Sequence, residues 1–254
     1  MAGYGAGVAG QALGIDIGGS GMKAAPVDVD RGVLVAPRKR IRTPRPANPE
    51  AVAAVAGQLV GHFDWDGPVG VALPAVVQHG IVRTAANIDP AWLGTDAVAT
   101  FAEVARGPVT VVNDADAAGL AEANFGAASG HLGVVVVVTL GTGIGTALLS
   151  GGVLVPNSEL GHLVVDGVEA EEQASDRARE RDGLSWKKYG RQLGAYLREL
   201  ERLLWPDLIV LGGGVSREAA EFVPHLGPLR ARVVPAVLLN EAGIVGAALA
   251  RLRA

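Results

Sequence analysis

The chain has 254 residues, 49% of them hydrophobic, which is enough for one large or two ordinary domains with well-filled cores. It has no cysteine, which excludes disulfides and a cysteine-bound structural zinc and fits the reducing cytoplasm, where we expect the protein to act. A net charge of −4 argues against a nucleic-acid partner. Apolar runs such as Val134 to Val138 are far below the roughly 20 residues of a membrane helix, so we expect no membrane partner either.

The first half of the sequence alternates strand-like and helical segments. Residues 1–11 are rich in glycine and alanine without apolar periodicity, so we expect a disordered leader. Asn48 as N-cap and Pro49 at the first helical position predict a helix. Apolar runs and turn residues predict strands at 13–17, 22–27, 32–41, 69–73 and 109–113, a hairpin around 78–83 and a helix at 96–105.

The second half repeats this theme. A strand at 133–140, a glycine turn at 141–145 and a returning strand at 146–149 come first. Ser185 then caps a long helix that Pro206 ends. The remaining predicted elements are a strand at 208–211, a glycine turn at 212–214, a helix after Ser216 and a last helix at 241–253. Because both halves contain strand, glycine loop and strand, the sequence predicts an α/β fold of two similar units.

Three glycine loops follow apolar strands, namely Gly18, Gly19 and Gly21, then Gly141, Gly143 and Gly145, and finally Gly212 to Gly214. Glycine lets a backbone approach a phosphate, because a side chain would block the approach and forbid positive φ. A plain tight turn is the alternative interpretation of each loop by itself. Neither a Walker A sequence nor a GxGxxG motif following a predicted strand is present, which argues against P-loop and Rossmann folds.

Asn113 and Asp114 end an apolar strand, where side chains of open α/β sheets face a ligand. A positioned aspartate that accepts a hydroxyl proton suits phosphoryl transfer to an alcohol. The alternative is that one of the two side chains caps a helix beginning around Ala115, and both roles could coexist because Asp116 is also available.

Glu159 and His162 follow a turn, and Glu171 comes a little further on. Carboxylates together with amide or imidazole donors are the groups that hold a polyol. Glu159 and His162 could instead bind zinc, but the sequence offers no cysteine and no other histidine nearby.

Two short segments concentrate positive charge. One contains Arg31, Arg38, Lys39, Arg40, Arg42 and Arg45, and the other contains Lys187, Lys188 and Arg191 at the start of the long helix. Either segment could face an anionic ligand, or it could be a solvated strand edge or helix face.

In order along the chain, these motifs resemble those of ROK-family sugar kinases, and more narrowly the polyphosphate glucokinase branch of that family. The resemblance covers nearly everything from Leu13 onward. Residues 16–23 resemble the first phosphate loop of the family, residues 140–145 its second, and residues 209–216 its nucleotide-side segment. Residues 159–162 resemble its sugar signature, and residues 171–175 resemble its Glu-x-x-Ala-Ser pattern.

The resemblance implies an actin-like ATPase or ribonuclease H-like duplicated fold with two lobes and a central cleft. Residues 12–112 with 242–254 would form a small N-terminal lobe, and residues 113–241 a large C-terminal lobe. It also implies Mg²⁺ at the transferring phosphates and a homodimer.

The resemblance implies phosphorylation of glucose at its 6-hydroxyl, with Asp114 as the general base. The implied glucose-binding residues are Asn87, Asn113, Asp114, Glu159, His162 and Glu171. The implied phosphate-binding residues are Asp16, Gly18, Gly19, Ser20, Lys23, Thr142, Gly143, Gly213 and Gly214.

The sequence lacks the cysteine-rich zinc segment that the family usually carries between the histidine and the second glutamate, so we predict no zinc. Residues 73–89, 113–122 and 185–189 resemble the polyphosphate-using branch more than ATP glucokinases. Polyphosphate is therefore the expected donor, and Lys187, Lys188 and Arg191 the expected path for its chain.

Two alternatives remain. An ATP-dependent glucokinase or glucomannokinase would share every catalytic residue. A non-catalytic sugar-binding regulator belongs to another class. Only about a dozen residues precede the first motif, so we expect no helix-turn-helix, and the presence of Asp114 argues for catalysis.

Overall fold

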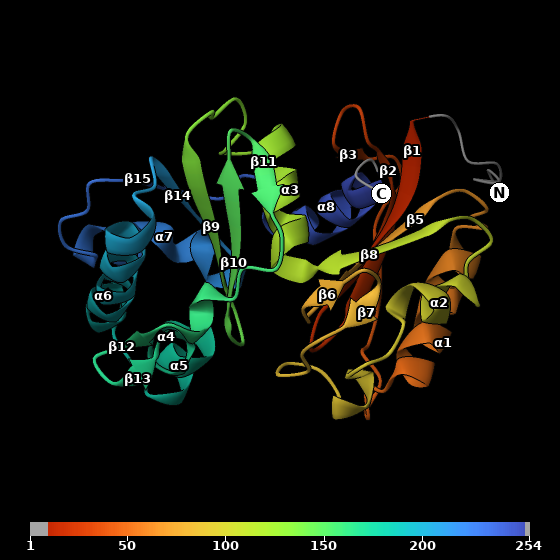
Figure 1. Ribbon diagram of the computed structural model, residues 1–254, viewed down its shortest axis with the longest axis horizontal. Coiled ribbons are helices and arrows are strands. Elements are labelled where there is room, and N and C mark those ends of the chain that lie inside the picture. The colour runs from red at the N-terminus through yellow and green to blue at the C-terminus, as the bar shows by residue number, and fades with distance from the viewer. Residues whose placement is uncertain (1–9, 252–254) are drawn as a thin grey trace. The chain divides into compact units, whose positions relative to one another are not determined.

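Two sheets with the same strand order form the framework of the protein (Figure 1). The computed structural model describes residues 10–251, so residues 1–9 of the predicted leader and the last residues of the predicted final helix lie outside the described part. Strand β1 begins at Gln11, inside the segment predicted as leader.

The first sheet has the order β3-β2-β1-β5-β8, and β4 pairs with β2. Its strands are β1 (Gln11–Ile17), β2 (Met22–Asp28), β3 (Val33–Leu34), β4 (Lys39–Ile41), β5 (Val69–Leu73) and β8 (Val109–Asn113). Strands β1 and β2 are antiparallel, while β1, β5 and β8 run parallel. The run predicted over 32–41 is two strands rather than one, because Pro37 has no backbone N–H for the ladder.

The second sheet has the order β11-β10-β9-β14-β15. Its strands are β9 (Val134–Leu140), β10 (Ile144–Ser150), β11 (Val153–Val155), β14 (Leu208–Gly212) and β15 (Arg232–Pro235). Again the first two strands are antiparallel, and β9, β14 and β15 run parallel. The shared order confirms the duplication that the two strand, loop and strand segments predicted.

The chain folds into two compact units, one up to Ala121 together with the residues from Glu241, the other Glu122–Asn240. Helix α3 (Asp114–Phe125) crosses from one unit into the other, whereas the predicted lobe boundary lies at its start. The first turn of α3 belongs to the first unit because Ala117 packs closely against Gly246 there.

Each sheet has a core on both faces. In the first unit, α1 (Pro49–His62) and α2 (Ala97–Ala102) cover one face, and α8 (Ala242–Ala250) covers β1 and β5. In the second unit, α6 (Trp186–Leu204) and α7 (Ala219–Phe222) cover one face. Small elements complete the fold: β6 (Val77–Gln78), β7 (Ile81–Val82), β12 (Val164–Val165), β13 (Val168–Glu169), α4 (Ala170–Ala174), α5 (Asp176–Arg181), and the 3₁₀ turns η1 (Pro90–Trp92), η2 (Leu160–His162), η3 (Gly214–Glu218), η4 (Val223–His225) and η5 (Leu239–Glu241).

The predicted helix caps are confirmed. The Asn48 side chain accepts a hydrogen bond from the Ala51 amide at 2.9 Å, and the Ser185 hydroxyl accepts one from the Lys188 amide at 3.4 Å. The helix predicted after Ser216 is the short α7, which lies between the 3₁₀ turns η3 and η4, because Pro224 lacks the N–H that a longer continuous helix needs. Within residues 10–251, no helix combines the length and apolarity that crossing a bilayer requires.

Helix α8 lies directly on the backbone of the first unit. A β-carbon added at Gly14 of β1 would collide with the Ile244 carbonyl oxygen of the helix. One added at Gly246 of the helix would collide with the Ala117 carbonyl oxygen of α3. Neither glycine has a positive φ, so the requirement is space and not backbone conformation. These contacts set the position of α8 against the carboxyl end of β1.

We expect Gly246→Ala to destabilise the first unit by about 2 kcal/mol, because overpacking a close backbone contact costs roughly 1–3 kcal/mol. Chemical denaturation measures the change. Gly61→Ala is the matched control, because it is also a helical glycine but its added β-carbon meets nothing within 4 Å. Equal stability of the two variants would contradict the close packing of α8.

Candidate functional site

The first glycine loop joins β1 to β2 in the first unit. The Gly18 amide donates to the Gly21 carbonyl at 3.2 Å, which closes the turn. Asp16, two residues earlier, is mostly buried and receives a hydrogen bond from Lys23 Nζ at 3.2 Å. A β-carbon at Gly243 would lie 2.7 Å from Asp16 Cγ, so this carboxylate sits at the first turn of α8. The positive end of the helix and the lysine both favour a negative charge there.

Asn113 and Asp114 lie at the same edge of this sheet as the loop. Asp16 pairs with Ala72 of β5, and Ala72 pairs with Val112 of β8. Parallel strands place their carboxyl ends at one edge, where open α/β sheets bind ligands. Two strand spacings separate β1 from β8, roughly 10 Å. That separation could accommodate a phosphoryl group near the loop and its acceptor hydroxyl near Asp114.

Asn113, rather than Asp114, is the N-cap of α3. Its Oδ1 accepts from the Ala115 amide at 2.8 Å and from the Asp116 amide at 3.1 Å, and its Nδ2 donates to the Ala75 carbonyl at 3.2 Å. The side chain is buried. One Nδ2–H therefore remains for a ligand, while both oxygen lone pairs are used.

Asp114 begins α3 and is half-buried, with its Oδ1 accepting from the Ala115 amide at 2.8 Å. The carboxylate thus stands at the end of β8 and the N-terminus of a helix, a position where a negative charge is stabilised. Asn87 lies exposed in the loop between β7 and η1, and it makes no hydrogen bond with the other residues in the described range.

The second glycine loop joins β9 to β10 in the second unit. The Gly141 amide donates to the Gly143 carbonyl at 3.0 Å, and the Gly141 carbonyl accepts from the Arg177 amide at 3.1 Å. Thr142 at the tip is exposed. Gly213 has φ of 83°, and its β-carbon would collide with the Leu140 carbonyl at the end of β9. The third glycine segment, which includes Gly213 and the exposed Gly214, therefore packs against the second loop.

The segment around Glu159 is attached to β10. The Thr146 hydroxyl donates to the Ser158 carbonyl at 2.6 Å and accepts from the Leu160 amide at 3.1 Å. Glu171 on α4 accepts from the Ile144 amide at 3.4 Å, at the first residue after the second loop. The segment around Glu159 and the carboxylate of Glu171 are therefore both held by β10, next to the second glycine loop.

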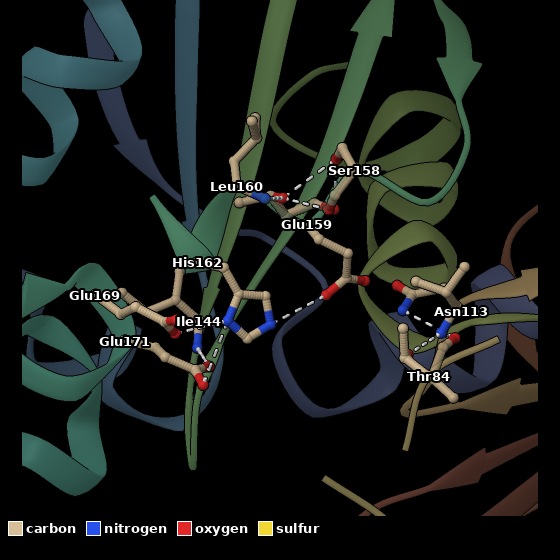
Figure 2. A network of polar contacts seen from close by, with 12 residues as sticks. Thr84, Asn113, Ile144, Ser158, Glu159, Leu160, His162, Glu169 and Glu171 are labelled. Carbon is tan, nitrogen blue, oxygen red and sulfur yellow. Dashed lines mark hydrogen bonds and ion pairs between the residues drawn. The ribbon is translucent and has the colours of Figure 1, made fainter. Parts of the chain in front are cut away.

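His162 stands between three carboxylates (Figure 2). Its Nδ1 lies 2.9 Å from Glu169 Oε2 and 3.8 Å from Glu171 Oε1, while its Nε2 lies 3.7 Å from Glu159 Oε2. An ionised carboxylate only accepts hydrogen bonds, so Nδ1 carries the proton toward Glu169. In the neutral ring, Nε2 is then an acceptor for a hydroxyl donor.

The pKa values of His162 and Glu159 are both raised in this cluster. The hydrogen bond from Nδ1 to Glu169 raises the pKa of His162, with further raising by the charges of Glu171, Glu169 and Glu159 and an opposing effect of burial. Burial raises the pKa of Glu159, opposed by His162. Because the folded state holds the His162 proton more tightly than the unfolded chain, this histidine stabilises the fold below about pH 6.5, and the contribution is lost as the pH rises through the folded-state pKa.

Glu169 is the site residue that sequence reasoning missed. The motif pattern pointed to Glu171, and Glu169 lies only two residues earlier. Strand β13 pairs with β12 so that Glu169 is opposite Val164, two residues after His162. A hairpin predicted over residues 164–169 would have placed Glu169 near His162 and is the signal that could have found it.

Three of these side chains have the spacing of a cation site. His162, Glu169 and Glu171 each offer a ligand atom, and these atoms lie within 4.8 Å of one another. The set consists of a nitrogen and carboxylate oxygens without sulfur, and Nδ1 already has a hydrogen-bond partner in Glu169. The expectation of no zinc stays a prediction.

The sequence pattern of the ROK family matches residues 12–183. The chain belongs to the ROK family. A polyphosphate glucokinase of Mycobacterium tuberculosis is 50% identical over 239 residues, which cover 94% of this chain and 90% of that protein.

Two solved structures extend the comparison. A polyphosphate/ATP-glucomannokinase from Arthrobacter matches with a TM-score of 0.92 and 50% identity, over 96% of this chain and 99% of the other. A ROK family glucokinase from Streptomyces griseus, in complex with glucose and AMPPNP, matches with a TM-score of 0.82 and 27% identity, over 96% of this chain and all (100%) of the other. The ROK protein described here therefore has the actin-like ATPase fold that its motifs implied.

Replacing Glu169 should lower the pKa of His162. In Glu169→Gln the side-chain amide oxygen still accepts from Nδ1, but the negative charge is lost, so the pKa falls toward the ordinary value of about 6.5. An NMR titration of the ring protons measures it. Glu172→Gln, which changes an exposed carboxylate three residues further on, in α4, is the control. An unchanged pKa in Glu169→Gln would mean that this hydrogen bond is not formed in solution.

Proposed function

We propose that this ROK protein is a polyphosphate-dependent glucokinase, which transfers a phosphoryl group from inorganic polyphosphate to the 6-hydroxyl of glucose. The observation that carries the proposal is the high identity, over nearly the whole chain, to proteins named for polyphosphate-dependent sugar phosphorylation. The motif residues for such a reaction are all present in the expected order.

Asp114 is the general base of this reaction. Its carboxylate takes the proton of the glucose 6-hydroxyl as the oxygen lone pair forms a bond to the terminal phosphorus. The bond from that phosphorus to the bridging oxygen breaks, and the shortened polyphosphate leaves with the electron pair. The proton then passes from Asp114 to solvent. Its place at the end of β8, beside the edge that carries the first loop, supports this role.

The glucose hydroxyls are held by Asn87, Asn113, Glu159, His162 and Glu171. Asn113 can act only as a donor, because the amides of α3 occupy its oxygen. His162, with its Nδ1–H directed to Glu169, offers Nε2 as the acceptor. Glu159, whose pKa is raised by burial, lies on the Nε2 side of the ring.

The phosphates are bound by Asp16, Gly18, Gly19, Ser20, Lys23, Thr142, Gly143, Gly213 and Gly214. The backbone amides of the glycine loops and the Lys23 ammonium attract the anion. Asp16 also fits Mg²⁺, which prefers one or two carboxylate oxygens together with substrate phosphates. When bound with the donor, the ion would neutralise charge that develops on the transferred group.

ATP is the second candidate donor. The Arthrobacter relative is named for both polyphosphate and ATP, and the third glycine segment resembles the nucleotide-side segment of the family. The homodimer that the resemblance implies and the cytoplasmic location stay predictions.

The proposed path for the polyphosphate chain lies on the second unit and consists of Lys187, Lys188 and Arg191. All three are exposed in the first turns of α6, and none lies within 4 Å of a carboxylate of the described chain. Cations near the N-terminus of a helix oppose its dipole, which argues for a use other than stability.

We expect the purified protein to make glucose 6-phosphate from glucose and polyphosphate, with a higher kcat/KM than with ATP. Steady-state assays with each donor measure the difference. Asp114→Asn should lower kcat by about 10²–10⁴ with little change in the glucose KM, because an amide cannot accept the proton. Asp166→Asn, the same change in an exposed turn, is the control. Full turnover by Asp114→Asn would show that the base is another residue.

Replacing Lys187, Lys188 and Arg191 together by alanine should raise the polyphosphate KM several-fold and leave glucose binding unchanged. The physical reason is the loss of three positive charges along the path of a polyanion. Arg202→Ala, at the other end of the same helix, controls for lost positive charge on α6. An equal loss of polyphosphate use and glucose binding would contradict this path.

A further inference from the structure

A second basic surface lies on the first unit beside the first glycine loop. Arg38, Arg40 and Arg42 occur at every second residue, within and on either side of β4, and all three are exposed. Alternate residues of an extended chain point to the same side, about 7 Å apart. We call these three residues the arginine row. The proposed function has given the arginine row no role.

Strand β4 is attached to the phosphate loop. It pairs with β2 so that Ile41 is opposite Met22, the first residue after the loop, and Arg40 is opposite Lys23. Just beyond the strand, the buried Thr43 donates to the Gly18 carbonyl at 2.5 Å. The arginine row is therefore placed by contacts with the loop itself.

Arg40 packs on the loop. Its Nη2 donates to the Ser20 carbonyl at 3.0 Å and to the Ser20 hydroxyl at 3.3 Å. A β-carbon at Gly21 would lie 2.7 Å from the guanidinium carbon of Arg40, and Gly21 does not have a positive φ. Glycine at position 21 therefore makes room for the arginine, and the turn by itself does not require it.

The positive charge of Arg40 has no counterion among residues 10–251. Lys23, directly across from Arg40, is paired with Asp16 at 3.2 Å, but no carboxylate of the described chain lies within 4 Å of Arg40. Like charges opposite each other in a sheet destabilise it. Protection of an edge strand by cations could explain an exposed Lys39. It does not explain why a guanidinium is packed against a phosphate loop.

We propose that the arginine row binds the phosphates of polyphosphate that follow the one transferred at the first loop. Arg40 contacts the chain first, because its Nε–H and Nη1–H donate to no acceptor in the described part of the chain and can each donate to a phosphate oxygen. Arg42 then binds further along the polyanion. The inference rests on the proposed function for the identity of the donor, and it adds a binding surface on the first unit.

The test compares Arg40→Gln with Lys39→Gln, which removes one charge from the neighbouring position on the same strand. Full-length protein is assayed for KM with long-chain polyphosphate and with ATP, and calorimetry measures the binding of long-chain polyphosphate without glucose. Arg40→Gln should weaken polyphosphate binding and raise its KM at least tenfold, with a change in the ATP KM below threefold, since ATP ends after three phosphates. Lys39→Gln should change each value less than twofold.

Arg40→Lys and the double variant Arg40→Gln/Arg42→Gln sharpen the result. The lysine keeps the positive charge but lacks the planar set of guanidinium N–H donors, so it should retain only part of the polyphosphate affinity. The double variant should bind more weakly than Arg40→Gln and should show a smaller dependence of affinity on salt, as expected when fewer cations neutralise a polyanion.

Equal polyphosphate affinity of Arg40→Gln and Lys39→Gln would overturn the inference. An equal loss with both donors, accompanied by a lower unfolding temperature, would also overturn it, because Arg40 would then only support the loop. A wild-type protein that binds polyphosphate but transfers phosphate only from ATP would refute the proposed donor, and the binding comparison would still decide the role of the arginine row.

Discussion

The contact between α8 and the sheet of the first unit is the constraint on which the first half of the site depends. Gly14 and Gly246 allow backbone to meet backbone, so the helix approaches more closely than side chains would permit. This approach brings the first turn of α8 against Asp16 and holds β1 and β5 under the helix. The parallel register of β1, β5 and β8 then places Asp114 and the first phosphate loop at one edge.

In the second unit, strand β10 has the corresponding role, because it holds the site residues in place. Its residues Ile144 and Thr146 bind Glu171 and the segment before His162 through backbone and hydroxyl hydrogen bonds. The three carboxylates around His162 then set its tautomer and raise its pKa. Elsewhere in this unit, the buried Glu122 accepts hydrogen bonds from the amides of Ala127 at 2.7 Å and Leu238 at 2.8 Å, which ties the end of α3 to the loop after β15. Polar groups thus position the site residues and the end of α3 in this unit, in addition to its apolar core.

Local signals predicted much of the fold. The caps at Asn48 and Ser185 were readable because capping depends on residues within one turn, and the strands around the glycine loops were readable because their apolar runs are short and bounded. The helix predicted after Ser216 is present but short, because Pro224 lacks the N–H that would extend it. Glu169 was missed because its partner His162 lies in η2, just before the opposite strand of the β12–β13 hairpin.

By itself the sequence determined the order of the motifs, the duplication of strand, loop and strand, and the candidate roles of Asp114 and His162, because these depend on residue type and spacing. Only the tertiary structure decided that Asn113 is the cap, that Glu169 holds His162, and that Arg40 packs on the first loop. Each of these depends on where a side chain points and what lies beside it. Arg40 meets a loop 20 residues away in sequence, and His162 meets Glu169 across a hairpin, so residue spacing alone does not encode either contact. The Asn113 cap is local, but Asn113 and Asp114 are adjacent residues that both favour the cap position, so only the direction of the side chains decides between them.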